Sequence, residues 1–275
     1  MVVALPDGTT LYQNEADTEF ESASLYKLGI MVEVYRQRDT GELSFDDLVT
    51  LYPGYFLEDD SVYGYDGDAY DQIPVGTLLD NMITLSSNVA ATALLDVVGT
   101  DNVNATMESL GLDHTKILWY PVAGGDAPSP YLTASASPGR QSGTLLSLNT
   151  PLAPRGSDSH ANVDGAYNVT TPDDVATLFE MLVDGTVVSA DASAEMLDLL
   201  SEQQINDRLP AGVPDGTRVA HKTGDLDNSV HDVGVIYAPN GPIVVVVLSD
   251  EVENREDVVE FIRQVAQLAY GAESP

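Results

Sequence analysis

The segments of this chain that favour β-strands lie at its two ends, and the segments that favour helices lie between them. At the start, Val2 to Ala4 and Thr9 to Tyr12 flank a Pro-Asp-Gly turn, which is a hairpin pattern. Near the other end, Thr217 to His221 is strand-like, and Ala-Pro-Asn-Gly joins Val230 to Tyr237 with Ile243 to Leu248 in a second hairpin pattern. A sheet made from these segments has to bring both chain ends together, with the intervening residues as an insertion.

Apolar residues at helical spacing predict helices in this insertion and after the last strand. They cover residues 25–38, 75–85, 89–98, 103–110, 172–183, 192–200 and 258–269. We therefore predict an α+β fold, with an antiparallel β-sheet built from both chain ends, flanking helices and an inserted all-helical lobe. Residues 1–275 form a single domain in two lobes, one of about 1–40 and 215–275 and one of about 41–214, which contains a long loop at 121–164. A cleft between the lobes is the expected binding site.

Acidic residues greatly outnumber basic ones. The chain has 44 Asp and Glu against 11 Lys and Arg, a formal net charge of −33. Such a surface repels polyanions, so nucleic acid is excluded as a partner. Lysine occurs only at Lys27, Lys116 and Lys222, which is typical either of a protein that stays soluble in concentrated salt or of a merely acidic chain. A lysine kept on this background is expected to have a specific role.

Composition also limits the kinds of site and location. There is no cysteine, which excludes disulfides, thiolate nucleophiles and cysteine-based metal sites. The four histidines lack metal-ligand spacing, and we expect no metal and no cofactor. No apolar run reaches the ~18 residues of a membrane span. Residues 1–12 have a strand pattern rather than that of a signal peptide; we expect a protein exported to the cell envelope or beyond, whose signal is missing from this sequence.

Ser24 and Lys27 are three residues apart at the start of a predicted helix, which places both side chains on one face. A serine hydroxyl becomes a good nucleophile when a neighbouring base takes its proton. A lysine can be that base if burial or a second cation, for which Lys222 is a candidate, lowers its pKa. The alternative is a helix-capping serine beside a surface lysine.

Two further motifs favour the catalytic interpretation. Ser86-Ser-Asn88 follows about sixty residues later, and Lys222-Thr-Gly224 lies at the end of a late strand. By chance, Ser-x-x-Lys is expected ~0.2 times in such a chain, Lys-Thr-Gly ~0.02 times and Ser-x-Asn ~0.9 times. The three motifs, together with the segments 75–88, 170–174 and 211–214, resemble those of class A β-lactamases and penicillin-binding proteins over roughly residues 2 to 270.

This resemblance implies a set of catalytic roles. Ser24 would be the acylated nucleophile, and Lys27 would be its general base. Ser86 would relay a proton to the leaving nitrogen. Lys222 would supply positive charge both to that serine and to a carboxylate of the substrate.

The resemblance also implies substrate-binding residues. Asn88 would hold the substrate amide, and Thr223, followed by Gly224, would donate a hydrogen bond to the substrate carboxylate. The oxyanion hole would consist of the backbone N–H groups of the nucleophilic serine and of Asp225, whose side chain has no expected role. Arg208 matches a carboxylate-binding arginine of some class A members, and the alternative is a surface cation.

The sequence departs from the class A pattern in two places. The middle motif reads Ser-Ser-Asn instead of Ser-Asp-Asn. In addition, no glutamate occurs between Glu108 and Glu180, where class A enzymes keep the glutamate that activates the deacylating water. Asp126, Asp158 or Asp164 would replace it poorly, because a shorter side chain in a loop rich in Pro and Gly does not fix a water well. Losing a general base typically costs ~10²–10⁴ in rate, so acylation would survive while deacylation stalls.

We therefore expect a penicillin-recognising serine hydrolase or acyl-transferase, closer to a D,D-peptidase than to an efficient β-lactamase. Its substrate would be a small molecule or a peptide, either a β-lactam or a D-Ala-D-Ala-type peptide. Efficient hydrolysis of β-lactams is the first alternative. A β-lactam sensor domain and an inactive scaffold are the others.

Overall fold

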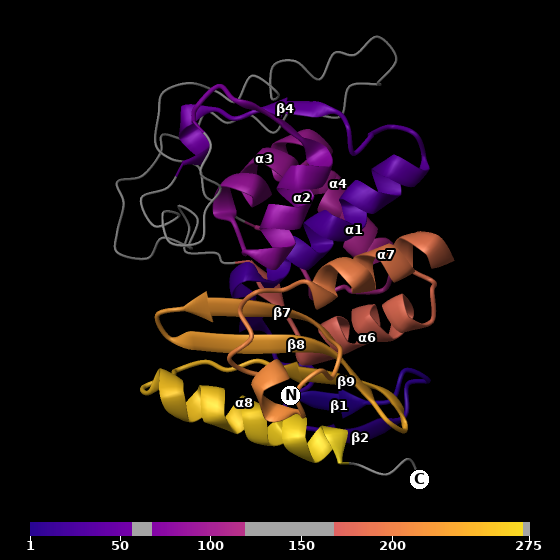
Figure 1. The fold of residues 1–275 in the computed structure, drawn as a ribbon, viewed down its shortest axis with the longest axis vertical. Helices are drawn as coiled ribbons and strands as arrows, with labels where there is room; N and C mark the ends of the chain where they lie inside the picture. Colours follow the sequence, from indigo (N-terminus) through magenta and orange to yellow (C-terminus); the bar gives the residue numbers. More distant parts are fainter. Residues whose placement is uncertain (57–67, 119–167, 272–275) are drawn as a thin grey trace.

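The fold is seen in a computed structural model that describes residues 1–56, 68–118 and 168–271. Its main sheet has five strands in the order β2-β1-β9-β8-β7, and all neighbouring strands are antiparallel. The strands are β1 (Val2–Ala4), β2 (Thr10–Gln13), β7 (Val219–Leu226), β8 (Ser229–Ala238) and β9 (Gly241–Val247). Two come from the beginning of the chain and three from its end, which confirms the predicted α+β fold (Figure 1). The predicted loop at 121–164 lies outside the described residues.

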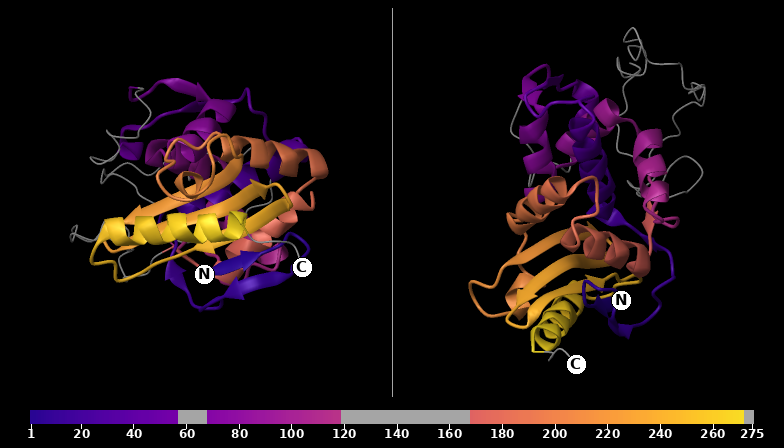
Figure 2. Two further views of the ribbon diagram at one scale, coloured as in Figure 1. Left: turned by 60° about the horizontal axis from the view of Figure 1, so that its bottom comes forward. Right: turned by 90° about the vertical axis from the view of Figure 1, so that its right-hand side faces the viewer.

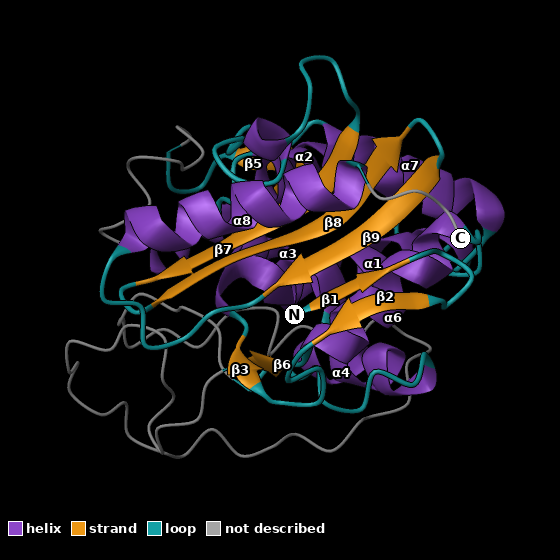
Figure 3. Ribbon diagram, turned by 90° about the horizontal axis from the view of Figure 1, so that it is seen from below, coloured by secondary structure: helices purple, strands orange, loops and turns teal. Residues whose placement is uncertain are grey.

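Both faces of this sheet are buried. Because side chains alternate along a strand, Val244 and Val246 of β9 pack in one hydrophobic core, and Ile243, Val245 and Val247 pack in a second one. The second core is closed by the C-terminal helix α8 (Arg255–Tyr270), which lies across the outer face of the sheet (Figure 3). The first core continues into the helical part of the molecule.

Helix α1 is the central element of the helical part and is buried along most of its length. The four helices here are α1 (Tyr26–Asp39), α2 (Val75–Thr84), α3 (Asn88–Val98) and α4 (Thr100–Ser109). A buried carboxylate links α1 to α4, because Glu33 accepts a hydrogen bond from the Thr106 hydroxyl at 2.7 Å. The four helices lie on the side of the sheet opposite α8 (Figure 2), and the residues just before α1 contact β7.

Short elements complete the described fold. They are the paired strands β3 (Phe20–Glu21) and β6 (Val169–Thr170), the paired strands β4 (Leu48–Thr50) and β5 (Gln72–Pro74), and the 3-10 turns η1 (Ala23–Leu25), η2 (Pro53–Tyr55) and η4 (Pro210–Gly212). Within the described ranges, no helix is both long and apolar enough to cross a membrane. Export of the protein stays a prediction.

Two helices that the sequence places in the helical lobe of about 41–214 also pack against the sheet. Helix α6 (Pro172–Val183) contacts β1, β8 and β9, and helix α7 (Ala190–Ser201) contacts β7, although α7 contacts α1 and α2 as well. Both helices lie directly over the strands in Figure 1. The division into two lobes stays a prediction, and this packing favours a boundary before α6 rather than at residue 215.

Candidate active site

Ser24 lies in η1, just before the central helix, whereas the sequence predicts that it opens the helix. The preceding residue, Ala23, has a φ of +44°, a left-handed conformation that costs about 1–2 kcal/mol for a residue with a side chain. The backbone N–H of Ser22 donates to the carbonyl of Asn168 at 2.7 Å, which fixes this segment beside β6. Ser24, the predicted nucleophile, is therefore held in a strained, anchored turn, an arrangement common at functional sites.

Lys27 lies at the centre of the polar cluster. Its Nζ is 3.2 Å from Ser24 Oγ and 3.3 Å from Ser86 Oγ. The same atom donates to Asn88 Oδ1 at 2.7 Å and to the carbonyl of Ser86 at 2.6 Å. The side chain is fully buried, so the alternative of a surface lysine is wrong. Two motifs about sixty residues apart in the sequence thus meet at one nitrogen.

The turn between α2 and α3 carries the middle motif. Ser86 has a φ of +60°, which is again a left-handed conformation. Ser87 caps α3, because its Oγ accepts the N–H of Ala90 at 3.1 Å. Aspartate caps helices as well as serine does. The departure from Ser-Asp-Asn therefore keeps the capping function and leaves the flanking serine and asparagine in place.

Lys222 approaches the same serine from the sheet. Its Nζ donates to Ser86 Oγ and to the carbonyl of Thr223, both at 2.9 Å. Its side chain is fully buried, and this burial lowers the pKa of Lys222 to about 7, although the carboxylates of Asp225 and Asp232 act in the opposite direction. Near neutral pH the lysine is thus divided between an ammonium and an amine. Residues 24, 27, 86 and 222 form one continuous group, as the sequence predicts.

Strand β7 runs through the Lys-Thr-Gly motif to Leu226, whereas the sequence predicts its end at His221. Pairing with β8 holds the extension, in which Gly224 lies opposite His231. A Cβ added at Gly224 would lie 3.1 Å from the Cβ of Ala23 and 3.1 Å from a ring carbon of His231. The missing side chain therefore lets the strand approach the turn that carries Ser24. The oxyanion hole of two backbone N–H groups stays a prediction.

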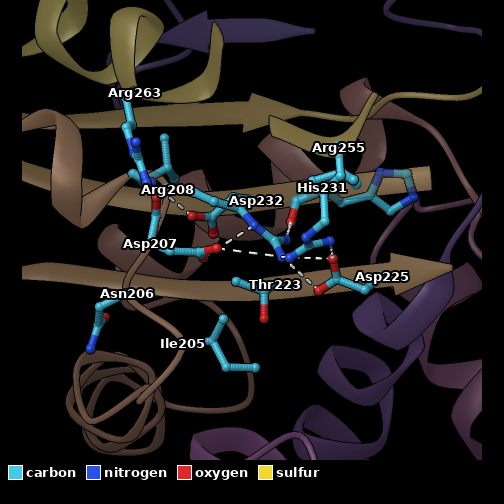
Figure 4. Close-up of polar contacts among 12 residues, drawn as sticks. Ile205, Asn206, Asp207, Arg208, Thr223, Asp225, His231, Asp232, Arg255 and Arg263 are labelled. Carbon is cyan, nitrogen blue, oxygen red and sulfur yellow. Dashed lines mark hydrogen bonds and ion pairs between the residues drawn. The ribbon is translucent and has the colours of Figure 1, made fainter. Parts of the chain in front are cut away.

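The side chains of Arg208 and Asp225 differ from expectation (Figure 4). Arg208 is fully buried, which rules out the surface cation. Its Nη2 binds both carboxylate oxygens of Asp225, at 2.6 and 2.7 Å, and its Nη1 donates to the carbonyl of His231 at 2.5 Å. Arg255, from the first turn of α8, forms a second ion pair with the same carboxylate. The sequence predicts a role only for the backbone N–H of Asp225, but its charged side chain also joins two arginines near the site.

A group of residues that no sequence motif indicates joins the Ser86 turn to the sheet. Gln203 donates from Nε2 to the carbonyl of Ile83 at 2.7 Å, and its Oε1 accepts two backbone N–H groups. Asn206 donates to the carbonyl of Gln203 and faces Nε2 of His221 at 3.0 Å. The other nitrogen of that buried histidine lies 2.8 Å from Asp232. These bonds run from the end of α2 to β7, which carries Lys222, and to its neighbour β8.

We predict that Gln203→Leu lowers the free energy of unfolding by about 2–3 kcal/mol. The substitution keeps the volume but leaves the Ile83 carbonyl and the Ile205 N–H without the Gln203 side chain as partner, while the Gln204 N–H keeps the Thr84 carbonyl. Gln204→Leu is the matched control, because Gln204 is exposed and pairs with the Thr84 carbonyl only through its backbone. It should change stability by no more than about 0.5 kcal/mol. Urea unfolding measures both, and equal effects would contradict a specific role of Gln203.

Comparisons with known proteins agree with this geometry. The sequence model of the beta-lactamase enzyme family matches residues 1–272. The extended-spectrum beta-lactamase PER-1 of Pseudomonas aeruginosa is 25% identical over 266 residues, which cover 92% of this chain and 75% of that protein. The crystal structure of a beta-lactamase from Sphaerobacter thermophilus has 26% identity and a TM-score of 0.75, covering 100% of this chain and 91% of that one. PBP-A has 25% identity and a TM-score of 0.74, covering 98% and 87%. A PBP-A variant with leucine replaced by glutamate was solved as an acyl-enzyme complex with penicillin G.

Proposed function

Because this chain belongs to the beta-lactamase enzyme family and is a serine hydrolase of the class A β-lactamase type, we propose that it opens an amide bond through an acyl-enzyme on Ser24. The substrates proposed are β-lactams and D-Ala-D-Ala-type peptides. The observation that carries the proposal is the contact of Lys27 Nζ with Ser24 Oγ and Ser86 Oγ, at 3.2 and 3.3 Å. One buried amine therefore reaches both hydroxyl groups that such a reaction uses.

In the proposed acylation, Lys27 takes the proton of the Ser24 hydroxyl as its oxygen attacks the carbonyl carbon. The tetrahedral intermediate then collapses, the C–N bond breaks, and the leaving nitrogen takes a proton from Ser86 Oγ. That hydroxyl lies between the two lysine nitrogens, at 3.3 and 2.9 Å, and regains a proton from one of them. Asn88, whose Oδ1 accepts from Lys27 Nζ at 2.7 Å, is the residue that we propose to contact the substrate amide.

We infer that deacylation is slow, which favours a D,D-peptidase-like enzyme over an efficient β-lactamase. No glutamate occurs between Glu108 and Glu180 to activate a water, and loss of a general base removes about 10²–10⁴ in rate from the step it serves. The aspartates that could substitute, at 126, 158 and 164, lie outside the described residues. The likeness to PBP-A supports this inference, and the likeness to PER-1 supports β-lactam hydrolysis as the second candidate.

We predict that penicillin G forms a long-lived adduct with this protein. Intact mass spectrometry should show a gain of one penicilloyl group that persists for minutes or longer, and peptide mapping should place it on Ser24. Ser24→Ala should show no adduct. Rapid return to the free mass would support an efficient β-lactamase instead, and absence of any adduct on the wild-type protein would overturn the proposed acyl-enzyme.

A further inference from the structure

At the end of β7, the carboxylate of Asp225 is in direct contact with two guanidinium groups from other parts of the chain. Arg208 is fully buried, and its Nη2 atom donates to both oxygens of Asp225. Arg255 pairs with the same carboxylate from the outside and is about half exposed. The Asp225 side chain itself is 37% exposed, so this carboxylate lies at the surface of the site while its main partner lies beneath it.

The carboxylate of Asp225 is ionised under ordinary conditions. Burial acts to raise the pKa of Asp225, but Arg208 and Arg255 outweigh it and bring the pKa below its usual value. A carboxylate bound to one guanidinium by two hydrogen bonds occupies the position that a ligand carboxylate would take on that arginine. The charge of Arg208 is therefore already compensated by the protein's own chain.

The position of Asp225 brings this charge close to the residues proposed to bind substrate. Thr223 and Asp225 are two residues apart on one strand, so their side chains leave β7 on the same face (Figure 4). Asp225 also acts electrostatically on Lys222, where it opposes the effect of burial on the pKa of that lysine. An anionic group that approached Thr223 and Lys222 would therefore meet the fixed negative charge of Asp225, and a buried arginine whose Nη2 is already bound to that charge.

We propose that Asp225 is a specificity-determining residue that disfavours substrates carrying a free carboxylate beside the scissile amide. The proposal rests on the function proposed above, because it concerns which amides acylate Ser24. According to this proposal, the Asp225 side chain occupies the place on Arg208 where a substrate carboxylate would bind. Substrates that carry an ester or an amide in place of this carboxylate are neutral there, so the repulsion does not lower their rate of acylation.

The test compares penicillin G with its methyl ester, which differ in one carboxylate charge. Second-order acylation rates are measured by intact mass spectrometry for the wild-type protein and for Asp225→Asn, which keeps an oxygen for Arg208. The ratio of the acid rate to the ester rate should rise by about tenfold in the variant, because the negative charge that repels the penicillin carboxylate is gone while the charge of Arg208 stays. Asp207→Asn is the matched control: it removes a carboxylate 3.4 Å from Arg208 Nε that is not bonded to Arg208 Nη2, and its ratio should stay within about twofold of the wild type.

Arg255→Gln provides a second variant with the opposite expected sign. It removes one cation from Asp225 and leaves Arg208 in place, at a side chain exposed enough for the fold to tolerate the change. The acid-to-ester ratio should fall about two- to threefold. Adducts that form with an unchanged ratio in both Asp225→Asn and Arg255→Gln would overturn this inference alone. Absence of adducts with either penicillin would overturn the proposed function, and this inference with it.

Discussion

Lys27→Ala is expected to slow acylation of Ser24 by penicillin G by a factor of about 10²–10⁴, the usual contribution of a positioned general base. In the structure the Lys27 amine is the group within hydrogen-bond distance of both the Ser24 and the Ser86 hydroxyls. Without it, water has to accept the serine proton, and the relay through Ser86 loses one of its two lysines. The rate is measured from the growth of the adduct in intact mass spectra.

A control variant and a folding check show whether the slower acylation is specific to Lys27. Lys116→Ala makes the same change at an exposed lysine outside the cluster and should acylate like the wild type. Circular dichroism and urea unfolding show whether Lys27→Ala is folded, since its loss leaves Asn88 Oδ1 and the Ser86 carbonyl without the lysine. A folded Lys27→Ala that acylates at the wild-type rate would remove Lys27 as the base.

The candidate catalytic cluster of residues 24, 27, 86 and 222 could be predicted from the sequence, because short motifs identify its members. Ser24 and Lys27 are one turn apart, and any helical or 3-10 turn brings such residues to one face. The Ser-Ser-Asn turn and the Lys-Thr-Gly strand were identified by their motifs, and the sheet by hairpin signals at both chain ends. The structure adds the distances, with Lys27 and Lys222 both reaching Ser86 Oγ.

Other features could not be predicted, because they depend on tertiary contacts. The partner of Arg208 is Asp225, 17 residues further along the chain, and 44 acidic residues offered as many candidates. The polar residues after His221 indicate a strand end, yet pairing with β8 and the close approach at Gly224 keep them in β7. Helix α6 has an apolar face that fits a helical lobe or a sheet equally well, and only its packing decides between them.

Lys222→Met is expected to stabilise the protein at pH 7 while it impairs acylation. Burial lowers the pKa of Lys222 from 10.5 to about 7, and this difference corresponds to a cost of about 5 kcal/mol for keeping the charged lysine in the folded state. Methionine has a similar shape and carries no charge. Loss of the hydrogen bonds to Ser86 Oγ and the Thr223 carbonyl offsets part of this increase in the free energy of unfolding. We expect a net increase of about 2 kcal/mol in the free energy of unfolding at pH 7.

The pH dependence of this difference gives the sharper test. Below about pH 7 the lysine is protonated in both the folded and the unfolded chain, so the cost is constant. Between about pH 7 and 10.5 the folded protein has released the proton and the unfolded chain has kept it, so the wild type becomes more stable as pH rises. The advantage of Lys222→Met should therefore shrink by about 1.4 kcal/mol per pH unit over this window. Other titrating groups cancel, because both proteins share them.

Urea unfolding of the wild type and of Lys222→Met at pH 7 and pH 9 measures the change, which should be about 2 kcal/mol over the two units because the folded lysine is still partly protonated at pH 7. Lys116→Met, at the exposed lysine, controls for the exchange of lysine for methionine as such. A difference that is the same at both pH values would show that the folded protein keeps the Lys222 ammonium throughout. The buried amine would then be a permanent charge, and its contact with Ser86 Oγ would serve binding and orientation rather than the return of a proton.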